Sequence, residues 1–438
     1  MSLTALRKHC QAFVAEEDGA GTILALYFTL MFLVVGGLAI DFNKTQTDLT
    51  QLQVATDSAA HAALYSREKM SSDDAKAVAV QVAESFMENV RFGSPITAED
   101  ITFGTWDKEA HVFTASLNSR SAVKVVSHMN EARENPSNNL LLKIIGQDSF
   151  NLSRTSVYST YRPPCFMEGF VADDVVDIQS NNSFGSGFCI HSNTYVSLNS
   201  NNTFEPGSVV SMPNLDDLDI PKSGFETNNG LEGALRTGTY RLRILNMMDE
   251  IIEALRVGDD EWLPSFMVAP LFDSFTATKV VPEDFTPNSI TTVSCGNNGT
   301  LTMDPGTYAN LVIITGCKVK FGQGAALEDV WMVSTNLDVK AFNAPSGLRL
   351  GADDSCAEGG GAVLITKGGF NAAADLQMYG SQILALKDIE FAANAEGIEG
   401  ASMVSYATIS GTSNMDMGFC NGNGQEENLQ ADYFRMVE

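Results

Sequence analysis

The chain has 438 residues, 44% of them hydrophobic, with 54 acidic and 27 basic side chains and a formal net charge of −27. This hydrophobic content excludes an intrinsically disordered chain and leaves room for two or three domains. The acidic surface disfavours nucleic acid and anionic lipid headgroups as partners, because like charges repel. It is typical of a solvated exterior, although divalent cations bound between acidic loops stay open as an alternative.

An uncharged run occupies residues 19–40, almost at the start of the chain. As a helix, these 22 residues extend about 33 Å, enough to cross a hydrocarbon core of about 30 Å. A secretory signal peptide has a shorter apolar core, of about 7 to 15 residues, and then a cleavage site. This run instead passes straight into Asp41 and a polar helix. We therefore predict an uncleaved transmembrane signal anchor at 19–40.

The flanking charges and the cysteines predict the orientation of the anchor. Arg7 and Lys8 precede the run and Lys44 follows it, so the positive-inside rule places residues 1–18 in the cytoplasm. Cys10 lies before the run, and six cysteines lie after it: Cys165, Cys189, Cys295, Cys317, Cys356 and Cys420. An even set suits an oxidising compartment. We therefore expect a single-pass protein of the bacterial inner membrane with its large C-terminal part in the periplasm.

Two helices are predicted after the span, and together they assign residues 41–92 to a helical stalk. The first continues out of the membrane, because small and apolar residues recur at helical spacing over 42–63 without glycine or proline. The second begins at Ser71, which forms a capping box with Asp74. Alanines on both helices allow close packing, either within one chain or against a neighbouring copy.

From Ile96 the hydrophobic period changes to the alternation that is typical of strands. Segments 101–117, 121–128 and 150–161 follow it, and the apolar piece 140–146 fits either strand or helix. We therefore predict a small α+β module over residues 93–162. It ends at a pair of prolines, residues 163–164, which punctuate the chain.

A repeat of 20 residues follows, because residues 178–193 align without gaps on residues 198–213. Asn182 then corresponds to Asn202, and Phe184 corresponds to Phe204. Short strands separated by Asn, Gly and Ser turns at this period are typical of a parallel β-solenoid, whose equivalent residues stack about 4.8 Å apart. We predict a first β-solenoid segment at 163–221, with low complexity in a polar loop as the alternative.

Cysteine spacing agrees with a coil of this length. Cys165 and Cys189 are separated by 24 positions, and Cys295 and Cys317 by 22, each about one coil. Adjacent coils bring α-carbons inside the range of about 4.4 to 6.8 Å that a disulfide requires. We predict these two disulfides, and the last two cysteines are left to close a larger loop.

The rest of the chain is predicted in two parts. The repeat lapses over residues 222–290, where apolar residues run at helical spacing up to about Gly258, so we expect a helical insertion. Short strands resume over 291–438, which we interpret as a C-terminal β-solenoid-like segment. The predicted fold is a single N-terminal transmembrane helix, a small α+β module, and an all-β parallel β-solenoid-like domain with a helical insertion.

The sequence lacks the motifs of common enzyme and cofactor sites: it contains no HExxH, GxSxG, P-loop or CxxC. His9 precedes the span, and His61 lies in the alanine-rich helix. His191 lies on a predicted strand, where its repeat partner is Ser211 and imidazole is therefore not required. We expect no catalytic, cofactor-binding or metal site.

Three acidic clusters are interpreted as solvated turns. They are Asp173, Asp174 and Asp177; Asp216, Asp217 and Asp219; and Asp353 and Asp354. Calcium binding and catalysis stay open as alternatives, because carbohydrate-active β-helices use carboxylates.

The order of these features resembles the TadG-like proteins of the tight-adherence (Flp/Tad) pilus-assembly family. The resemblance rests on EEDGAG at 16–21, GLAID ending at Asp41, and LQVATDSAAHAAL at 52–64. Strands like the family's closing strands follow, and residues 165–193 resemble its Cys-bounded, Asn-rich segment. The von Willebrand-type metal motif of some relatives is missing, as is the glutamate that pilins carry five residues into the span, which favours an assembly component over a cleaved pilin.

This resemblance implies a membrane-anchored, non-enzymatic envelope component of a Tad/Flp-type pilus-assembly or secretion apparatus that supports surface adhesion. Its expected partners are other pilus-assembly or envelope proteins, and the membrane through one helix. Nucleic acid and cofactors are not expected, and self-association is left open. The alternative is a membrane-anchored carbohydrate-active β-helix enzyme or a carbohydrate-binding adhesin.

Overall fold

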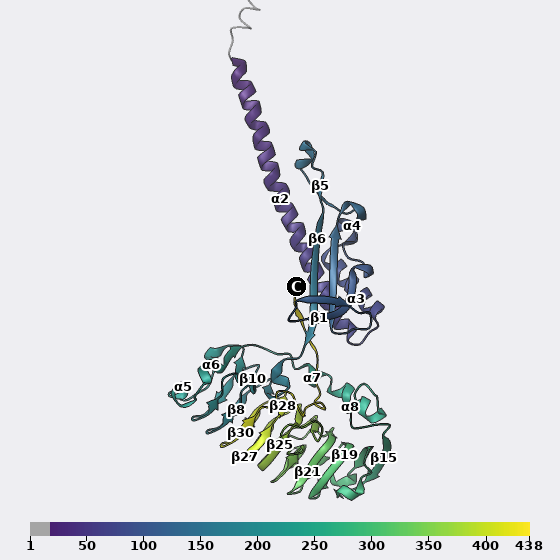
Figure 1. The fold of residues 1–438 in the computed structure, drawn as a ribbon, viewed down its shortest axis with the longest axis vertical. Coiled ribbons are helices and arrows are strands. Elements are labelled where there is room, and N and C mark those ends of the chain that lie inside the picture. The colour runs from purple at the N-terminus through teal and green to yellow at the C-terminus, as the bar shows by residue number, and fades with distance from the viewer. Residues whose placement is uncertain (1–17) are drawn as a thin grey trace, which may run out of the picture. The chain divides into compact units, whose positions relative to one another are not determined.

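The computed structural model describes residues 18–438, which form two compact units (Figure 1). The first unit comprises the chain up to Tyr161 together with Asp432–Glu438, and the second comprises Arg162–Ala431. The chain therefore leaves the first unit once and returns to it at its C-terminal end. Residues 1–17, which include Arg7, Lys8, His9 and Cys10, lie outside the described part.

The first unit is built on one long helix, α2 (Asp18–Arg67), of 50 residues. Its apolar run is exposed, and Phe32 for example is 73% exposed. From Gly37 onward one stripe is buried at helical spacing, through Asp41 and Asp48 to Leu52. The predicted continuation of the helix beyond the apolar run is confirmed.

Helix α3 (Ser72–Phe86) begins where the capping box predicts, because the Ser71 side chain accepts a hydrogen bond from the Asp74 N–H. The short helix α4 (Asn89–Phe92) follows it. Alanines of α3 and α2 share one buried cluster: Ala59, Ala60 and Ala63 with Ala75, Ala79 and Ala83. These small side chains therefore pack within one chain.

A five-stranded antiparallel sheet completes the first unit, in the order β2-β1-β3-β6-β31. Its strands are β1 (Ile101–Asp107), β2 (Val112–Ala115), β3 (Ala122–Met129), β6 (Leu152–Tyr161) and β31 (Tyr433–Met436). Phe103 and Val123 pack against the alanines of α2, so the helices of residues 41–92 belong to one compact unit with the sheet. A two-stranded hairpin, β4 (Ser137–Asn138) with β5 (Ser149–Phe150), encloses a 3₁₀ helix, η3 (Leu142–Ile145).

Strand β31 differs from the expectation that residues 291–438 form one solenoid-like segment. It pairs antiparallel with β6, with Tyr433 opposite Tyr161. Local alternation predicts a strand here but does not say which sheet the strand joins.

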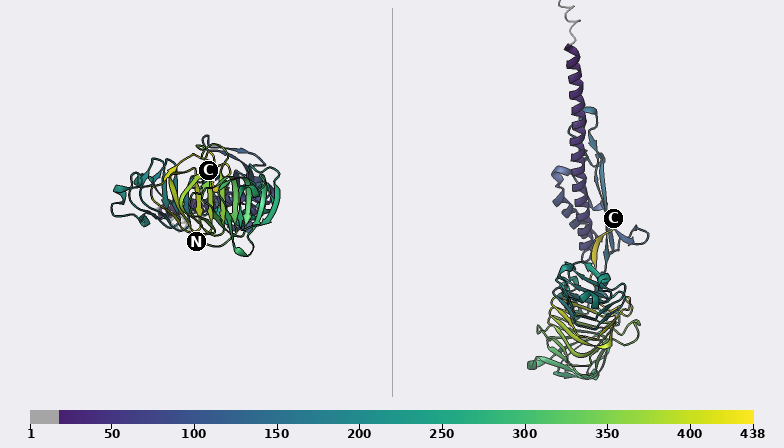
Figure 2. Two further views of the ribbon diagram at one scale, coloured as in Figure 1. Left: turned by 90° about the horizontal axis from the view of Figure 1, so that it is seen from below. Right: turned by 90° about the vertical axis from the view of Figure 1, so that its left-hand side faces the viewer.

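The second unit holds a sheet of 24 strands whose pairings are all parallel among the described residues (Figures 1 and 2). The strands are β7 (Gly169–Ala172), β8 (Val176–Ile178), β9 (Ser183–Phe184), β10 (Cys189–Ser192), β11 (Val196–Leu198), β12 (Thr203–Phe204), β13 (Val209–Met212), β14 (Leu235–Thr237), β15 (Leu271–Thr276), β16 (Lys279–Val280), β17 (Ser289–Ser294), β18 (Thr300–Met303), β19 (Gly306–Thr315), β20 (Lys318–Phe321), β21 (Ala325–Ser334), β22 (Phe342–Ala344), β23 (Arg349–Leu350), β24 (Ala362–Thr366), β25 (Phe370–Tyr379), β26 (Gln382–Ala385), β27 (Ile389–Glu399), β28 (Ser402–Ser405), β29 (Ile409–Gly411) and β30 (Asp416–Gly418).

The predicted 20-residue period is the register of the first strands of this sheet. Strands β7, β8 and β9 pair with β10, β11 and β12 at an offset of 20 residues, so that Phe184 lies opposite Phe204. Alternate side chains of these strands, including both phenylalanines, enter one apolar core.

The strands do not stack in chain order. Strand β7 lies between β10 on one side and β28 on the other. One row of C-terminal strands pairs in the order β15, β17, β19, β21, β24, β26 and β28. Its last strand, β28, lies beside β7, the first strand of the unit. Strands far apart in sequence, such as those at residues 169 and 402, are therefore neighbours.

The segment expected as a helical insertion, 222–290, contains both helices and strands. Its helices are α5 (Gly224–Thr227), α6 (Leu231–Ala234), α7 (Arg243–Asn246) and α8 (Met248–Val257). Helix α8 ends at Gly258 in the left-handed conformation, as the glycine predicts. Strands β14, β15 and β16, and the start of β17, lie in the same segment.

Candidate functional site

Three polar side chains of α2, Asp41, Lys44 and Asp48, fix the β4–β5 hairpin of the first unit to the helix just after the apolar run. We call these three residues the polar seam. The two carboxylate oxygens of Asp41 accept hydrogen bonds from the backbone N–H groups of Leu140, Leu141 and Leu142, at 2.7, 2.9 and 2.7 Å. These donors open the turn of η3, so one buried aspartate caps the start of the turn. We call residues 140–146 the η3 loop.

Two further side chains of α2 extend the seam one and two turns along the helix. Asp48 accepts a hydrogen bond of 2.6 Å from the Ser137 hydroxyl. The Lys44 ammonium contacts both groups, at 2.7 Å from Asp48 and 3.2 Å from Ser137. The hairpin is therefore held to α2 at several points.

Gly37 lets the η3 loop approach the helix closely. A Cβ atom at this position would lie 2.9 Å from the Leu141 Cβ, closer than such atoms pack. The preceding Gly36 has no neighbouring atom within 4 Å of its Cβ position. The close approach of the loop therefore requires glycine at position 37 but not at position 36.

The environment of Asp41 keeps its carboxylate charged. Burial alone would raise its pKa, but the N–H donors of the η3 loop and the nearby Lys44 outweigh burial and hold the pKa below its ordinary value of 3.8. The sequence placed Asp41 at the edge of the span but gave no sign of its partners, which lie about 100 positions away.

The six cysteines of the second unit form three disulfides. Cys165–Cys189 and Cys295–Cys317 join the pairs that spacing predicts, with α-carbons 4.9 and 6.1 Å apart. Cys356–Cys420 closes a larger loop, with α-carbons 5.7 Å apart. These six cysteines therefore have no free thiol that could act as a nucleophile in the oxidised protein.

The repeated asparagines form a ladder of hydrogen bonds across neighbouring strands. The Asn202 Oδ1 accepts from the Asn182 N–H at 2.9 Å, and the Asn182 Oδ1 accepts from the Met415 N–H at 2.9 Å. The Asn202 N–H in turn donates to the Asn228 Oδ1 at 2.8 Å. Each side chain thus satisfies a backbone donor of a neighbouring segment, which explains the recurrence of asparagine.

The histidines named from the sequence occupy two kinds of environment. His191 is fully buried, and its Nδ1 lies 2.7 Å from the Oγ of Ser211, its repeat partner. Its Nε2 lies 3.0 Å from the Asn193 Oδ1, and burial lowers its pKa. His61 is exposed on α2 and stacks with Tyr65.

The structure joins two of the acidic clusters along one register line. Glu390, Ser410, Asp177, Ser197 and Asp219 are successive partners on neighbouring strands. The Ser197 hydroxyl donates to the Asp219 carboxylate at 3.1 Å. Burial, and then the charge of Asp219, raise the pKa of Asp177.

A shallow groove of about 320 Å³ lies beside this line. Its polar lining includes Gln179, Asn371, Glu390 and Thr412. The Asn371 amide donates to the Glu390 carboxylate at 3.0 Å. Amide, hydroxyl and carboxylate groups therefore converge on one open surface.

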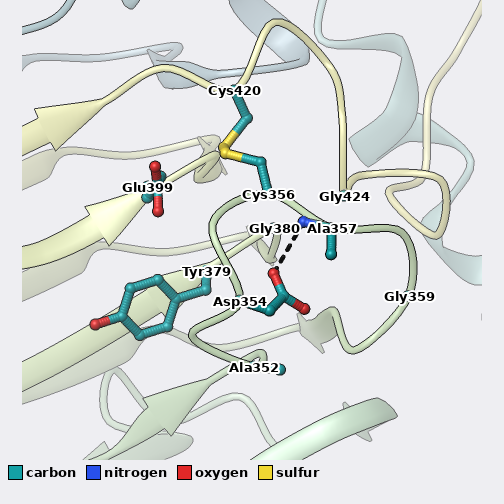
Figure 3. Close-up of a pocket in the computed structure, with 10 residues that line it drawn as sticks. All are labelled: Ala352, Asp354, Cys356, Ala357, Gly359, Tyr379, Gly380, Glu399, Cys420 and Gly424. Atoms are coloured by element: carbon teal, nitrogen blue, oxygen red, sulfur yellow. Dashed lines mark hydrogen bonds between the residues drawn. A yellow bond between two sulfur atoms is a disulfide. The ribbon is translucent and has the colours of Figure 1, made fainter.

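The third acidic cluster borders the crevice at the Cys356–Cys420 disulfide (Figure 3). The Asp354 carboxylate accepts the Ala357 N–H at 3.0 Å, and Glu399 lies beside the disulfide (Figure 3). The crevice leaves no room for a water molecule. The two sulfurs are bonded to each other, so this cluster of sulfur and carboxylate atoms does not supply thiolate ligands to a metal.

Glu168 is a buried acid that the sequence reasoning missed. Its carboxylate accepts hydrogen bonds from the backbone N–H groups of Cys420 and Gly422, each at 2.7 Å. Burial raises its pKa above the ordinary 4.5 despite these donors. A lone glutamate among apolar neighbours at 165–172 is the signal that could have revealed it.

Each of the two units contains a segment that matches a protein family. Helix α2 is long and apolar enough to cross a membrane. Residues 19–78 match the Tad family, described as Flp pilus-assembly TadE/G-like, so the chain carries a TadE/G-like segment at its N-terminal end. Residues 169–421, more than half of the chain, match a domain of unknown function, DUF7867, and the chain belongs to that family. No curated protein and no solved structure matches the chain.

Proposed function

We propose that this chain is a non-enzymatic envelope component of a Tad/Flp-type pilus-assembly or secretion apparatus, anchored in the inner membrane by residues 19–40 and supporting surface adhesion. The observation that carries the proposal is the coincidence of the TadE/G-like match at 19–78 with the exposed apolar face of α2. A helix that leaves about 20 apolar residues in water needs another environment, and a bilayer provides it.

The large C-terminal part is assigned to the periplasm. Three disulfides in the second unit support an oxidising compartment. The basic residues that precede the span support a cytoplasmic N-terminus.

We also infer that the second unit winds as a parallel β-solenoid that presents rigid surfaces to other pilus-assembly or envelope proteins. Register offsets of 20 residues and the asparagine ladder support this winding. Stacked turns expose long, evenly spaced rows of side chains, and such rows suit contact with extended partners.

Exchange of the anchor tests this proposal. A strain lacking the protein receives either the full chain or a chain in which a cleavable secretory signal peptide replaces residues 1–40. Both deliver the same domains to the periplasm, and only the full chain is expected to restore surface attachment and to resist carbonate extraction. Attachment restored fully by the unanchored form would contradict the proposal.

A second candidate function, glycan binding or glycan-directed catalysis, is favoured by one observation. The groove that contains Asn371 and Glu390 lies beside the carboxylates and hydroxyls of one register line. Binding of purified cell-surface polysaccharide to the protein tests it: Glu390→Gln should weaken binding, whereas Glu226→Gln, an exposed site on α5, should not. Equal binding by both variants would remove this candidate.

A further inference from the structure

The η3 loop exposes an unusual group of large aliphatic side chains. Leu140, Ile144 and Ile145 are 62, 75 and 58% exposed, although Leu142 between them is buried. Three neighbouring aliphatic side chains on one short turn form an apolar surface that water does not favour.

This surface lies beside the end of the apolar run of α2. Leu141 contacts Gly37, and Asp41 holds the backbone of the loop. Gly37 lies three residues before Ile40, which is about 4.5 Å along a helix. The loop therefore lies against the last turn of the apolar run. Its position along the axis of α2 is that of the boundary between the apolar and the polar residues of the helix.

The polar groups of this region suit a position at the boundary between lipid and water. The Asp41 carboxylate is covered by the η3 loop and receives three N–H donors, so its charge has partners without water. Lys143 stands among the aliphatic residues, and its long stem allows the ammonium to reach lipid headgroups.

We propose that the η3 loop inserts into the periplasmic leaflet as a second lipid contact beside the span, with its aliphatic side chains among the acyl chains. The proposal rests on the proposed membrane anchoring by α2. The occupant of the apolar surface is lipid, because the loop is fixed to the one helix of the described residues that is long and apolar enough to cross a membrane.

Quenching of a tryptophan by brominated lipid tests the proposal. Full-length Ile144→Trp protein is reconstituted into phosphatidylcholine–phosphatidylglycerol vesicles with bromine on the acyl chains, and the emission of the three native tryptophans is subtracted using wild type. Val112→Trp is the control, since Val112 is half exposed in the sheet that packs on α2 around Ala59. Ala59 lies about 28 Å beyond Ile40 along the helix.

The added tryptophan at position 144 should emit at shorter wavelength and lose intensity to brominated lipid, and the one at position 112 should do neither. An unquenched position 144 in protein that resists carbonate extraction overturns the lipid contact and leaves the anchor intact, whether the side chain then meets water or another protein. Loss of carbonate resistance in the wild type overturns both the anchor and the loop contact.

Discussion

At the scale of single residues, two adjacent glycines of the apolar run have different roles. Replacing Gly37 by Leu should displace the η3 loop, because a Cβ there would collide with Leu141. The backbone amides of residues 140–142 should then exchange hydrogen faster, since their bonds to Asp41 lengthen.

The matched control is Gly36→Leu, which adds the same side chain in open space. Hydrogen exchange followed by mass spectrometry should show unchanged protection in this variant. Equal exchange in the two variants would mean that the glycine contact does not hold the loop.

Glu168 should make the stability of the second unit depend on pH. Because burial raises its pKa in the folded state above the ordinary 4.5, the folded protein binds the proton more tightly than the unfolded chain. Its contribution therefore becomes less favourable as pH rises from about 4.5 through the raised pKa.

Glu168→Gln removes this titration, so the variant should lose less stability than wild type between pH 5 and pH 7. Urea unfolding at both pH values measures the difference. Parallel pH profiles for the two proteins would contradict the assignment.

At the scale of elements, aromatic stacking holds strands β9 and β12 together. Phe184 and Phe204 are buried and stack at 4.9 Å between ring centroids. Phe204→Ala should cost about 3 to 5 kcal/mol in the free energy of unfolding, because it leaves a cavity in the core.

Thr203→Ala, at the neighbouring exposed position, should change stability by less than about 0.5 kcal/mol. Denaturant unfolding of the two variants gives the comparison. Similar losses for both would show that the stack is not what stabilises these strands.

The asparagine ladder makes a separate contribution to the same strands. Asn202→Ala removes the acceptor for the Asn182 N–H and the donor to the Asn199 carbonyl, and both Asn182 and Asn202 are buried. A buried donor left without a partner costs about 1 to 3 kcal/mol. Thermal unfolding should show this loss relative to Thr203→Ala, and a neutral Asn202→Ala would exclude the ladder as a source of stability.

At the scale of the whole molecule, the two compact units should unfold separately. Deleting residues 432–438 removes edge strand β31 from the first unit, and reducing the disulfides acts on the second unit. Closing a loop of 24 residues is worth on the order of 3 kcal/mol, so reduction should lower the transition of the second unit.

Calorimetry should therefore show two transitions: truncation lowers one, and reductant lowers the other. A single transition that moves with both treatments would show that the units unfold as one. Non-reducing peptide mapping of the intact protein supplies the control that the three disulfides are formed.

Local sequence patterns by themselves determined several elements of this protein. Helix α2, the cap at Ser71 and the 20-residue register follow from the spacing of apolar and capping residues, which act over a few positions. The cysteine spacing likewise predicted Cys165–Cys189, because a separation close to the 20-residue register brings the partners onto neighbouring strands.

Only the tertiary structure decided which distant segments meet. The pairing of β7 with β28, the return of β31 to the first unit, and the capping of the η3 loop by Asp41 join residues about 100 or more positions apart. Hydrophobic period shows that a strand has a buried face but not which strand lies beside it. The packing of complete elements makes that choice. Any strand edge can pair with another parallel edge, and any apolar face can cover another, so the correct neighbours are selected only when the whole core is assembled.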